Sequence, residues 1–333
     1  MSLHRPGLAL VTGASGFLGH HLVEHLLAEG VAVRALVRRR EDADRLTRRG
    51  VEVRVGDITE ATDVGAAVDA VDTVFHLAAI VGPAAVSQER FDSINAGGTR
   101  NVLDACRERA GIARIVHVSS VAVTEGAGGA ELVTESTRAA PAGRYGISKW
   151  RAEQAVRAAC DGGLPVVTVR PSWVYGWRAP GAVKLFQRIA HRRMVLIGRA
   201  DNIMQPIAVE DVVDGLWRAA TVAGIGGEVF QFAGPETVTT GAFCREVALA
   251  LGVDPPRLHV PRPVASAAAR LCEWVYPANW GKPPIDRNKL AFFTTSQRHS
   301  NVRAASTLGW TPAIGVRAGV ANAVRDMRAR GLL

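Results

Sequence analysis

The stretch that decides the fold is LALVTGASGFLG, residues 8–19. A short apolar run leads directly into three glycines, Gly13, Gly16 and Gly19, and an amphipathic segment follows. This order is typical of a strand, a glycine-rich turn and a helix. Such a turn lets the backbone approach a pyrophosphate closely, and the first N–H groups of the helix can bind the phosphates. The stretch therefore predicts a dinucleotide-binding fold.

Three glycines alone are a weak signal, because the chain has 34 glycines among its 333 residues. Here the surrounding sequence supports the motif. An apolar run precedes it, a helical pattern follows it, and a second strand is expected at residues 31–37. This context favours a binding turn over a purely structural one.

Tyr145 and Lys149 stand four residues apart in the segment YGISK. On a helix, both side chains would project from one face, a turn apart. A lysine ammonium beside a phenol lowers the pKa of the phenol, which would make Tyr145 a usable acid or base near neutral pH. By itself, so short a pattern indicates no more than a surface tyrosine and a solvated lysine. Upstream, however, the apolar strand IVHVSS ends in Ser119 and Ser120.

The glycine turn, the serine pair and the Tyr-x-x-x-Lys segment, in this order, resemble the short-chain dehydrogenase/reductase superfamily. The glycine spacing and the chain length resemble its extended branch, the NAD-dependent epimerase/dehydratase family. The resemblance continues through the segments GDITE, VFHLAA, NAGGTRNVLDAC, RPSWVYG, AVEDVVDGL and GEVFQFAGPETVT, which begin at residues 56, 74, 95, 170, 208 and 227.

Apolar strands alternate with helical patterns through residue 170, which predicts an α/β fold with a doubly wound parallel sheet. We expect this Rossmann domain to span residues 1–175, with residues 206–233 returning to it. Residues 176–205 and 234–333 are expected to form a smaller C-terminal α/β lobe that binds the substrate. Since 48% of the residues are hydrophobic, the chain can bury a large core.

The resemblance implies a cofactor site built from the glycine turn and the ends of several strands. Its expected residues are Gly13, Ser15, Gly16, Phe17, Leu18, Gly19, Arg38, Asp57, Ile58, Leu77, Ala78, Ala79, Ser119, Lys149, Pro171 and Val174.

The resemblance also implies catalytic roles. Tyr145 would pass a proton to or from the substrate oxygen, and Lys149 would hold the nicotinamide ribose and tune Tyr145. A serine would hold the substrate oxygen; Ser120 is the expected residue and Ser119 the alternative. Asn95 is expected to support the proton relay, with a purely structural role as its alternative.

The segment VAVRALVRRR, around the end of the second expected strand, bears on the choice of cofactor. An acidic residue there would bind the ribose 2′-OH of NAD, whereas an arginine accommodates the 2′-phosphate of NADP. Arg38 occupies this position, and the first acidic residue, Glu41, lies beyond the strand. We therefore expect NADP(H). NAD is the alternative, since a guanidinium can also stack on adenine.

Three departures from the family's sugar-nucleotide members argue against a nucleotide-sugar substrate. The turn RPSWVYG has Ser172 and Trp173 where those members usually have an asparagine. MQPIAVED has Gln205 and Pro206 where they have an arginine. The loop after the serine pair also lacks the adjacent Asp-Glu of the dehydratases.

Residues 261–315 resemble the 3β-hydroxysteroid dehydrogenase-like group, which includes bacterial reductases of long-chain β-keto acids. Apolar and aromatic side chains there would suit the wall of a lipophilic pocket. They are Leu271, Trp274, Val275, Tyr276, Trp280, Phe292 and Phe293. For any single one, a place in the core of the smaller lobe is the alternative. Contact of residues 274–282 with a membrane surface is a further alternative.

We therefore expect an NADP(H)-dependent oxidoreductase that interconverts a secondary alcohol and a ketone on a lipophilic or cyclic substrate. One alternative is a nucleotide-sugar epimerase or dehydratase with tightly bound NAD. The other is a non-catalytic, redox-sensing regulator, against which the intact Tyr145–Lys149 pair argues.

Composition and motif content argue against several other classes of protein. The chain has 40 basic and 31 acidic residues, but the arginines are dispersed and no nucleic-acid motif is present. The four cysteines have neither metal-site nor disulfide spacing, so no metal is expected. Without a signal peptide or a membrane-spanning apolar run, we expect a cytoplasmic protein with no stable membrane insertion. The resemblance implies a homodimer.

Overall fold

A computed structural model of the chain describes residues 4–81, 86–127, 132–275, 290 and 295–333. At its centre lies a seven-stranded sheet with the strand order β12-β7-β5-β4-β1-β2-β3, and every neighbouring pair is parallel. The strands are β1 (Leu8–Thr12), β2 (Ala32–Val37), β3 (Glu52–Val55), β4 (Thr73–His76), β5 (Arg114–Val118), β7 (Val166–Pro171) and β12 (Val229–Phe232). The central strands are buried and mainly apolar, because both faces of the sheet are covered.

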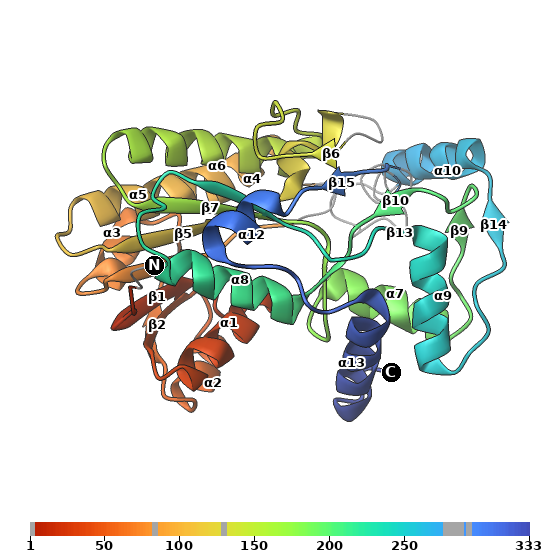
Figure 1. Cartoon of the computed structure of the whole chain (residues 1–333), viewed down its shortest axis with the longest axis horizontal. Helices are drawn as coiled ribbons and strands as arrows, with labels where there is room; N and C mark the ends of the chain where they lie inside the picture. The colour runs from red at the N-terminus through yellow and green to blue at the C-terminus, as the bar shows by residue number, and fades with distance from the viewer. Residues whose placement is uncertain (1–3, 82–85, 128–131, 276–289, 291–294) are drawn as a thin grey trace.

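Two layers of helices enclose this sheet (Figure 1). Their apolar faces pack into separate core clusters, one on each side. One layer is α3 (Ala61–Val68), α5 (Gly98–Arg107) and α6 (Gly143–Asp161). The other is α1 (Phe17–Ala28), α2 (Arg40–Thr47), α8 (Val209–Thr221) and α12 (Val302–Leu308). The predicted α/β fold with a doubly wound parallel sheet is confirmed.

The order of the strands reverses between β1 and β4, because the chain first builds the sheet towards β3 and then returns to build it towards β12. Ligands of doubly wound sheets bind at such a switch point, outside the carboxyl ends of the strands. The residues just after β1, β2, β4 and β5 therefore face the expected ligand crevice.

A smaller group of elements lies at the other end of the molecule (Figure 1). Its helices are α7 (Pro180–Ala190), α9 (Thr240–Leu251), α10 (Arg262–Val275) and α13 (Val316–Ala329). Its strands form two-stranded sheets: β8 (Val174–Tyr175) with β11 (Ile207–Ala208), β9 (Leu196–Ile197) with β14 (His259–Val260), and β10 (Ile203–Met204) with β13 (Val238–Thr239). A third core cluster, which includes Tyr175, Phe186 and Phe243, holds α7, α9 and α13 together.

Short elements connect these parts. They are α4 (Gln88–Phe91), a π-helical turn (Asp92–Gly97), two 3₁₀ turns (Val121–Val123 and Glu125–Ala127), and the paired strands β6 (Leu132–Val133) and β15 (Arg298–His299). After α8 the chain enters the main sheet again as β12, beside β7. The exact boundaries of the two expected lobes stay a prediction.

No helix among the described residues is long and apolar enough to span a bilayer. Within the same residues, no three His, Cys, Asp or Glu side chains gather as metal ligands. The four cysteines are free, and two of them, Cys106 and Cys244, are buried.

Candidate active site

The glycine turn is built from positions that tolerate no side chain. Gly13 has a φ of +76°, and a Cβ there would lie 2.8 Å from the backbone nitrogen of Ala78. A Cβ on Gly19 would lie 2.2 Å from the carbonyl oxygen of Gly13. The turn therefore packs α1 tightly against β1 and the end of β4, as the third glycine of a dinucleotide-binding turn requires.

The N-terminus of α1 is open to a ligand. Gly16, the N-cap residue, is extended and supplies no side-chain cap, and the first turn contains no acidic residue. The first N–H groups, which include those of Phe17 and Leu18, lack partners within their own helix. Uncapped N–H groups and the positive end of the helix dipole suit a pyrophosphate. The turn itself is braced from outside, since the Arg178 guanidinium donates to the Ser15 carbonyl over 3.2 Å.

Arg38 leaves the sheet at the same edge as the glycine turn, because Thr12 pairs with Leu36 across β1 and β2. Its side chain is exposed and forms no ion pair with any residue that the structure describes. Its neighbour Arg39 differs, since it pairs with the carboxylate of Asp42. Within the described part of the chain, Arg38 is therefore a cation without an ionic partner, at the strand end where the adenosine ribose is expected.

The two residues expected at the adenine are held by local contacts. The Asp57 carboxylate accepts hydrogen bonds from the backbone N–H and the hydroxyl of Thr59, each over 3.0 Å. The side chain of Ile58 is buried beneath α5, where a Cβ on Gly98 would lie 2.5 Å from it. Any contact of Ile58 with adenine would therefore come from its backbone.

The segment after β4 lies beside the glycine turn and would form the floor of the expected ligand crevice. The Leu77 N–H donates to the carbonyl of Thr12 over 3.2 Å, and the Ala78 N–H donates to the Thr12 hydroxyl over 3.3 Å. Ala79 follows directly. Small side chains at these two positions leave room above the sheet next to Gly13.

Helix α6 places Tyr145 and Lys149 on the other side of the switch point. Lys149 is 2% exposed, and its Nζ donates to the Val118 carbonyl at the end of β5 over 2.6 Å. Burial lowers the pKa of Lys149 from 10.5 to about 8, although the Glu153 carboxylate opposes this shift. The ammonium is thus anchored at the carboxyl end of the sheet, one turn from the phenol.

The pKa of Tyr145 departs from the sequence-based expectation. Burial raises it above its ordinary value of 10, while a hydrogen bond with the Ser120 side chain pulls it down. The expected lowering by Lys149 is not found: burial has the largest effect on this pKa, and the Ser120 hydrogen bond is what opposes it. Tyr145 is accordingly a protonated phenol at neutral pH, which suits a proton donor.

The structure distinguishes the two serines. The Ser120 hydroxyl bonds to the phenol of Tyr145 and accepts the Ala122 N–H over 3.2 Å, which caps the following 3₁₀ turn. The Ser119 hydroxyl is buried and has no hydrogen-bond partner among the described residues. The geometry brings Ser120, and not Ser119, to the tyrosine.

Asn95 lies in the π-helical turn, and its described side-chain hydrogen bonds go to neither Tyr145 nor Lys149. Its amide oxygen accepts the Ile80 N–H over 2.8 Å, and its amide nitrogen donates to the Ile80 carbonyl over 3.1 Å. The same nitrogen donates to the Ser148 hydroxyl over 2.9 Å, and that hydroxyl donates to the Tyr145 carbonyl over 2.8 Å. Asn95 therefore ties the loop after β4 to helix α6.

Sequence reasoning missed the partners that fix α6. The Arg170 guanidinium, on β7, donates to both oxygens of the Glu153 carboxylate, over 2.9 and 2.6 Å. Both side chains are buried. Glu153 stands four residues after Lys149, so the i, i+4 spacing on one helix face was an available signal. Nothing in the local sequence identified Arg170 as its partner.

The remaining cofactor positions lie at the boundary between the two groups of elements. Pro171 ends β7 opposite Phe232, and Val174 pairs with Ile207. Of the apolar and aromatic side chains expected around the substrate, Leu271 and Val275 are exposed on α10. The side chain of Trp274 and all of Tyr276, Trp280, Phe292 and Phe293 lie outside the described residues.

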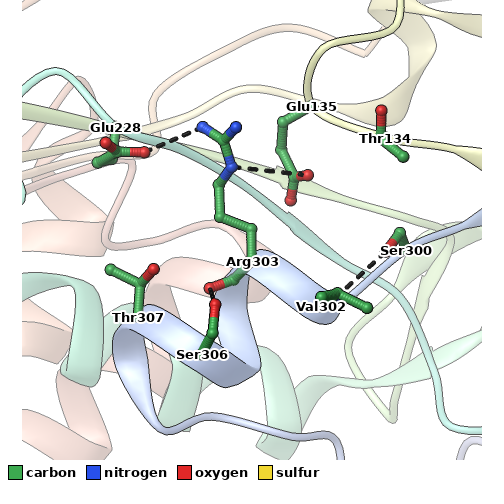
Figure 2. Close-up of a pocket in the computed structure, with 8 residues that line it drawn as sticks. All are labelled: Thr134, Glu135, Glu228, Ser300, Val302, Arg303, Ser306 and Thr307. Carbon is green, nitrogen blue, oxygen red and sulfur yellow. Dashed lines mark hydrogen bonds and ion pairs between the residues drawn. The ribbon is translucent and has the colours of Figure 1, made fainter.

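A groove of about 580 Å³ lies away from these residues, between α12, β12 and the segment after β6. Figure 2 shows Arg303 reaching between two carboxylates; its distances are 3.0 Å to Glu228 and 4.0 Å to Glu135. The Glu135 carboxylate also accepts the Gln231 N–H over 2.9 Å. None of the expected catalytic or cofactor residues lines this groove, and Arg303 serves there to fasten α12 to the sheet.

Comparison with known proteins identifies the family of the chain. The family model described as "NAD dependent epimerase/dehydratase family" matches residues 9–233. The chain belongs to this family. The region matched includes the glycine turn, the serine pair and the Tyr145–Lys149 segment.

Three relatives illustrate the range of the family. The chain is 29% identical to the human "Sterol-4-alpha-carboxylate 3-dehydrogenase, decarboxylating", over 96% of this chain and 87% of that protein. It is 32% identical to the "4-hydroxy-2-methyl-3-oxo-4-farnesyl-3,4-dihydroquinoline-1-oxide ketoreductase" of Stigmatella aurantiaca, over 80% of each. The solved structure "MoeE5 in complex with UDP-glucose and NAD" is 25% identical, with a TM-score of 0.78 over 98% of this chain and 100% of that one.

These comparisons confirm the expected family, the Rossmann architecture and an enzyme of the dehydrogenase/reductase type. They also confirm the similarity to the 3β-hydroxysteroid dehydrogenase-like group. A nicotinamide dinucleotide is the cofactor of the family, and the relative MoeE5 binds NAD.

Proposed function

We propose that this protein is an NADP(H)-dependent oxidoreductase that interconverts a secondary alcohol and a ketone on a lipophilic or cyclic substrate. The observation that carries the proposal is the arrangement of Tyr145, its hydrogen-bonded partner Ser120 and the anchored Lys149 at the switch point of the sheet. The glycine turn opens onto the same edge. These elements supply a proton donor and a dinucleotide site together.

The chemistry follows from the protonation states. When bound, the nicotinamide cofactor supplies or takes up a hydride. During ketone reduction, charge develops on the substrate oxygen, and the phenol of Tyr145 gives its proton to that oxygen. Ser120 holds the oxygen within reach of the phenol, and Lys149 places a positive charge nearby that stabilises the phenolate left behind.

Arg38 supports NADP over NAD. It is an exposed guanidinium with no ion pair among the described residues, at the strand end where the adenosine ribose is expected. A doubly charged phosphate there would give it a partner. The end of β2 offers no carboxylate in its place to bind a free 2′-OH.

The relatives support the substrate class. Two proteins that align with most of this chain are named for a sterol carboxylate and for a farnesylated quinoline oxide. Both names describe large, mainly apolar ring compounds with an oxygen function. We therefore propose a lipophilic alcohol or ketone for this chain.

The test is net oxidation of NADPH, followed by absorbance, with a panel of lipophilic ketones and β-keto acids. We expect turnover with at least one class and none with Tyr145→Phe. That variant should still bind NADPH, because the phenol is not needed to hold the dinucleotide. Turnover retained by Tyr145→Phe would contradict the mechanism.

A nucleotide-sugar epimerase or dehydratase is the second candidate, because MoeE5 is 25% identical and binds UDP-glucose and NAD. Such an enzyme returns the hydride to its own substrate and shows no net redox change. NAD that stays bound through purification, together with no oxidation of NADPH by any ketone, would favour this candidate.

A further inference from the structure

A row of buried polar side chains crosses four neighbouring strands beneath the crevice. Thr12, His76, His117 and Thr168 stand opposite one another in register on β1, β4, β5 and β7. They are 0%, 2%, 1% and 3% exposed. Buried polar groups require hydrogen-bond partners, so a polar row inside an otherwise apolar sheet calls for a structural reason.

Half of this row belongs to a continuous hydrogen-bonded chain. The Thr12 hydroxyl lies 2.8 Å from Nδ1 of His76, and Nε2 of His76 lies 3.0 Å from the Thr99 hydroxyl. The Thr99 hydroxyl donates to the Asn95 carbonyl over 2.6 Å. At the other end, the Thr12 hydroxyl accepts the Ala78 N–H.

These bonds fix the direction of every proton. Thr99 has one hydroxyl hydrogen, which it gives to Asn95, so it must accept from Nε2–H of His76. Because burial keeps the ring neutral, only one of its nitrogens carries a hydrogen, so Nδ1 is unprotonated and accepts the hydroxyl hydrogen of Thr12. His76 is therefore a neutral imidazole in the Nε2–H form.

Each end of the chain reaches part of the proposed active site. Thr12 holds the Ala78 amide, in the floor beside the glycine turn. Asn95 holds both the N–H and the carbonyl of Ile80 and continues through Ser148 to the Tyr145 carbonyl. The path thus runs without interruption from the floor of the dinucleotide site to the catalytic helix.

We infer that His76, in its Nε2–H tautomer, is a positioning residue that fixes the cofactor floor and helix α6 relative to one another. What it positions rests on the proposed function. Its surroundings keep the ring neutral, because burial lowers the pKa of His76 from 6.5 to about 3 and the Lys149 charge acts in the same direction. The ring of His117 stacks on it at 5.5 Å and closes off the side that faces β5.

Substitution of Thr99 tests the role with the least change of shape. Thr99→Val keeps the volume but removes the acceptor of Nε2–H, whereas Thr99→Ser keeps the hydroxyl. Thr168→Val is the matched control: the same change in the same buried row, at a hydroxyl with no hydrogen bond among the described residues. The measurement is the Kd for NADPH, obtained by fluorescence titration of the folded protein without substrate.

We expect Thr99→Val to raise the Kd for NADPH by about tenfold. The variant leaves the buried Nε2–H of His76 without an acceptor, and the free-energy cost of an unpaired buried donor corresponds to about a tenfold change in an equilibrium constant. Thr99→Ser should restore wild-type affinity, and Thr168→Val should retain it. A purely structural role would lower the thermal midpoint of Thr99→Val and leave its Kd unchanged. That result would overturn the proposal.

A second readout does not depend on any ligand. In ¹⁵N-histidine-labelled protein, His76 should show one protonated-type and one unprotonated-type ring nitrogen, with Nε2 protonated. Its assignment would come from a His76→Gln spectrum. The Nδ1–H tautomer or an imidazolium signal at neutral pH would overturn the proposal. If the wild-type protein bound neither NADPH nor NADH, the proposed function would fail, while this spectrum would still decide whether His76 forms the bridge.

Discussion

Lys149 is a buried cation, and its burial lowers the free energy of unfolding of the protein. Burial lowers its pKa to about 8, so at pH 7 the folded state keeps a charge that it solvates poorly. Its hydrogen bond to the Val118 carbonyl offsets this only in part. A residue kept at such a cost is typical of a functional site.

Lys149→Met should therefore abolish turnover while making the fold more stable. We expect the free energy of unfolding at pH 7 to rise by about 1–2 kcal/mol, because one pKa unit corresponds to about 1.4 kcal/mol and one hydrogen bond is lost. Since the folded pKa lies below the unfolded value, the penalty is full below pH 8 and disappears as pH rises towards 10.5. Urea unfolding of both proteins at several pH values measures this, and a large loss of stability in the variant would contradict it.

Arg38 provides a prediction about cofactor choice. Arg38→Ala should weaken NADPH binding by about tenfold or more and leave NADH binding nearly unchanged, because the 2′-phosphate occurs only in NADPH. Arg40→Ala is a matched control, an exposed arginine two residues further on, and should affect neither cofactor to this extent. Calorimetric titration with both cofactors decides the point. Equal weakening of both would show that Arg38 stacks on adenine.

At the scale of elements, α6 is held by one buried ion pair. Glu153→Gln should lower the free energy of unfolding by about 3 kcal/mol, since it leaves the buried Arg170 charge without its partner. Arg151→Ala, which removes a half-exposed partner of Asp92 from the same helix, should cost less than about 1 kcal/mol. Chemical unfolding of the two variants tests this contrast. Similar losses would mean that the buried pair has no special part in fixing the helix.

Elements with short-range signals could be predicted from the sequence. The glycine turn, α1 and the Tyr145–Lys149 face of α6 depend on residues within about one helix turn of each other, and the structure contains them. The sequence predicted a lowered pKa for Tyr145, and this was wrong. Burial of the phenol raises the pKa, and that burial depends on the packing of segments distant in the sequence. The clamp between Asn95 and Ser148 joins residues 53 positions apart, and the π-helical turn that presents Asn95 has no local signature.

At the scale of the whole molecule, buried histidines predict sensitivity to acid. Burial lowers the pKa of His76 to about 3 and that of His299 to about 4, and it holds the pKa of His117 well below its usual value. Below pH 6.5 the unfolded chain takes up protons that the folded protein does not, so stability falls as pH falls towards 4. Each histidine contributes up to about 1.4 kcal/mol per pH unit.

Urea unfolding at pH 7, 6 and 5 measures this dependence. The free energy of unfolding should decline steeply between pH 6 and 5. In His299→Leu this decline should be smaller by up to about 1.4 kcal/mol per pH unit, the contribution of one buried histidine. A stability that stays constant over this range would show that these rings are hydrated or protonated in the folded protein.

For the whole enzyme, we propose that hydride passes between a dissociable NADP(H) and a separate ketone or alcohol. The most direct measurement uses NADPH in which both C4 hydrogens of the nicotinamide are replaced by deuterium, with mass spectrometry of the product. We expect one deuterium on the carbinol carbon and one NADP⁺ released per product molecule. A product without deuterium, formed while the cofactor stays bound and unchanged in amount, would contradict the claim and identify an enzyme that recycles its own hydride.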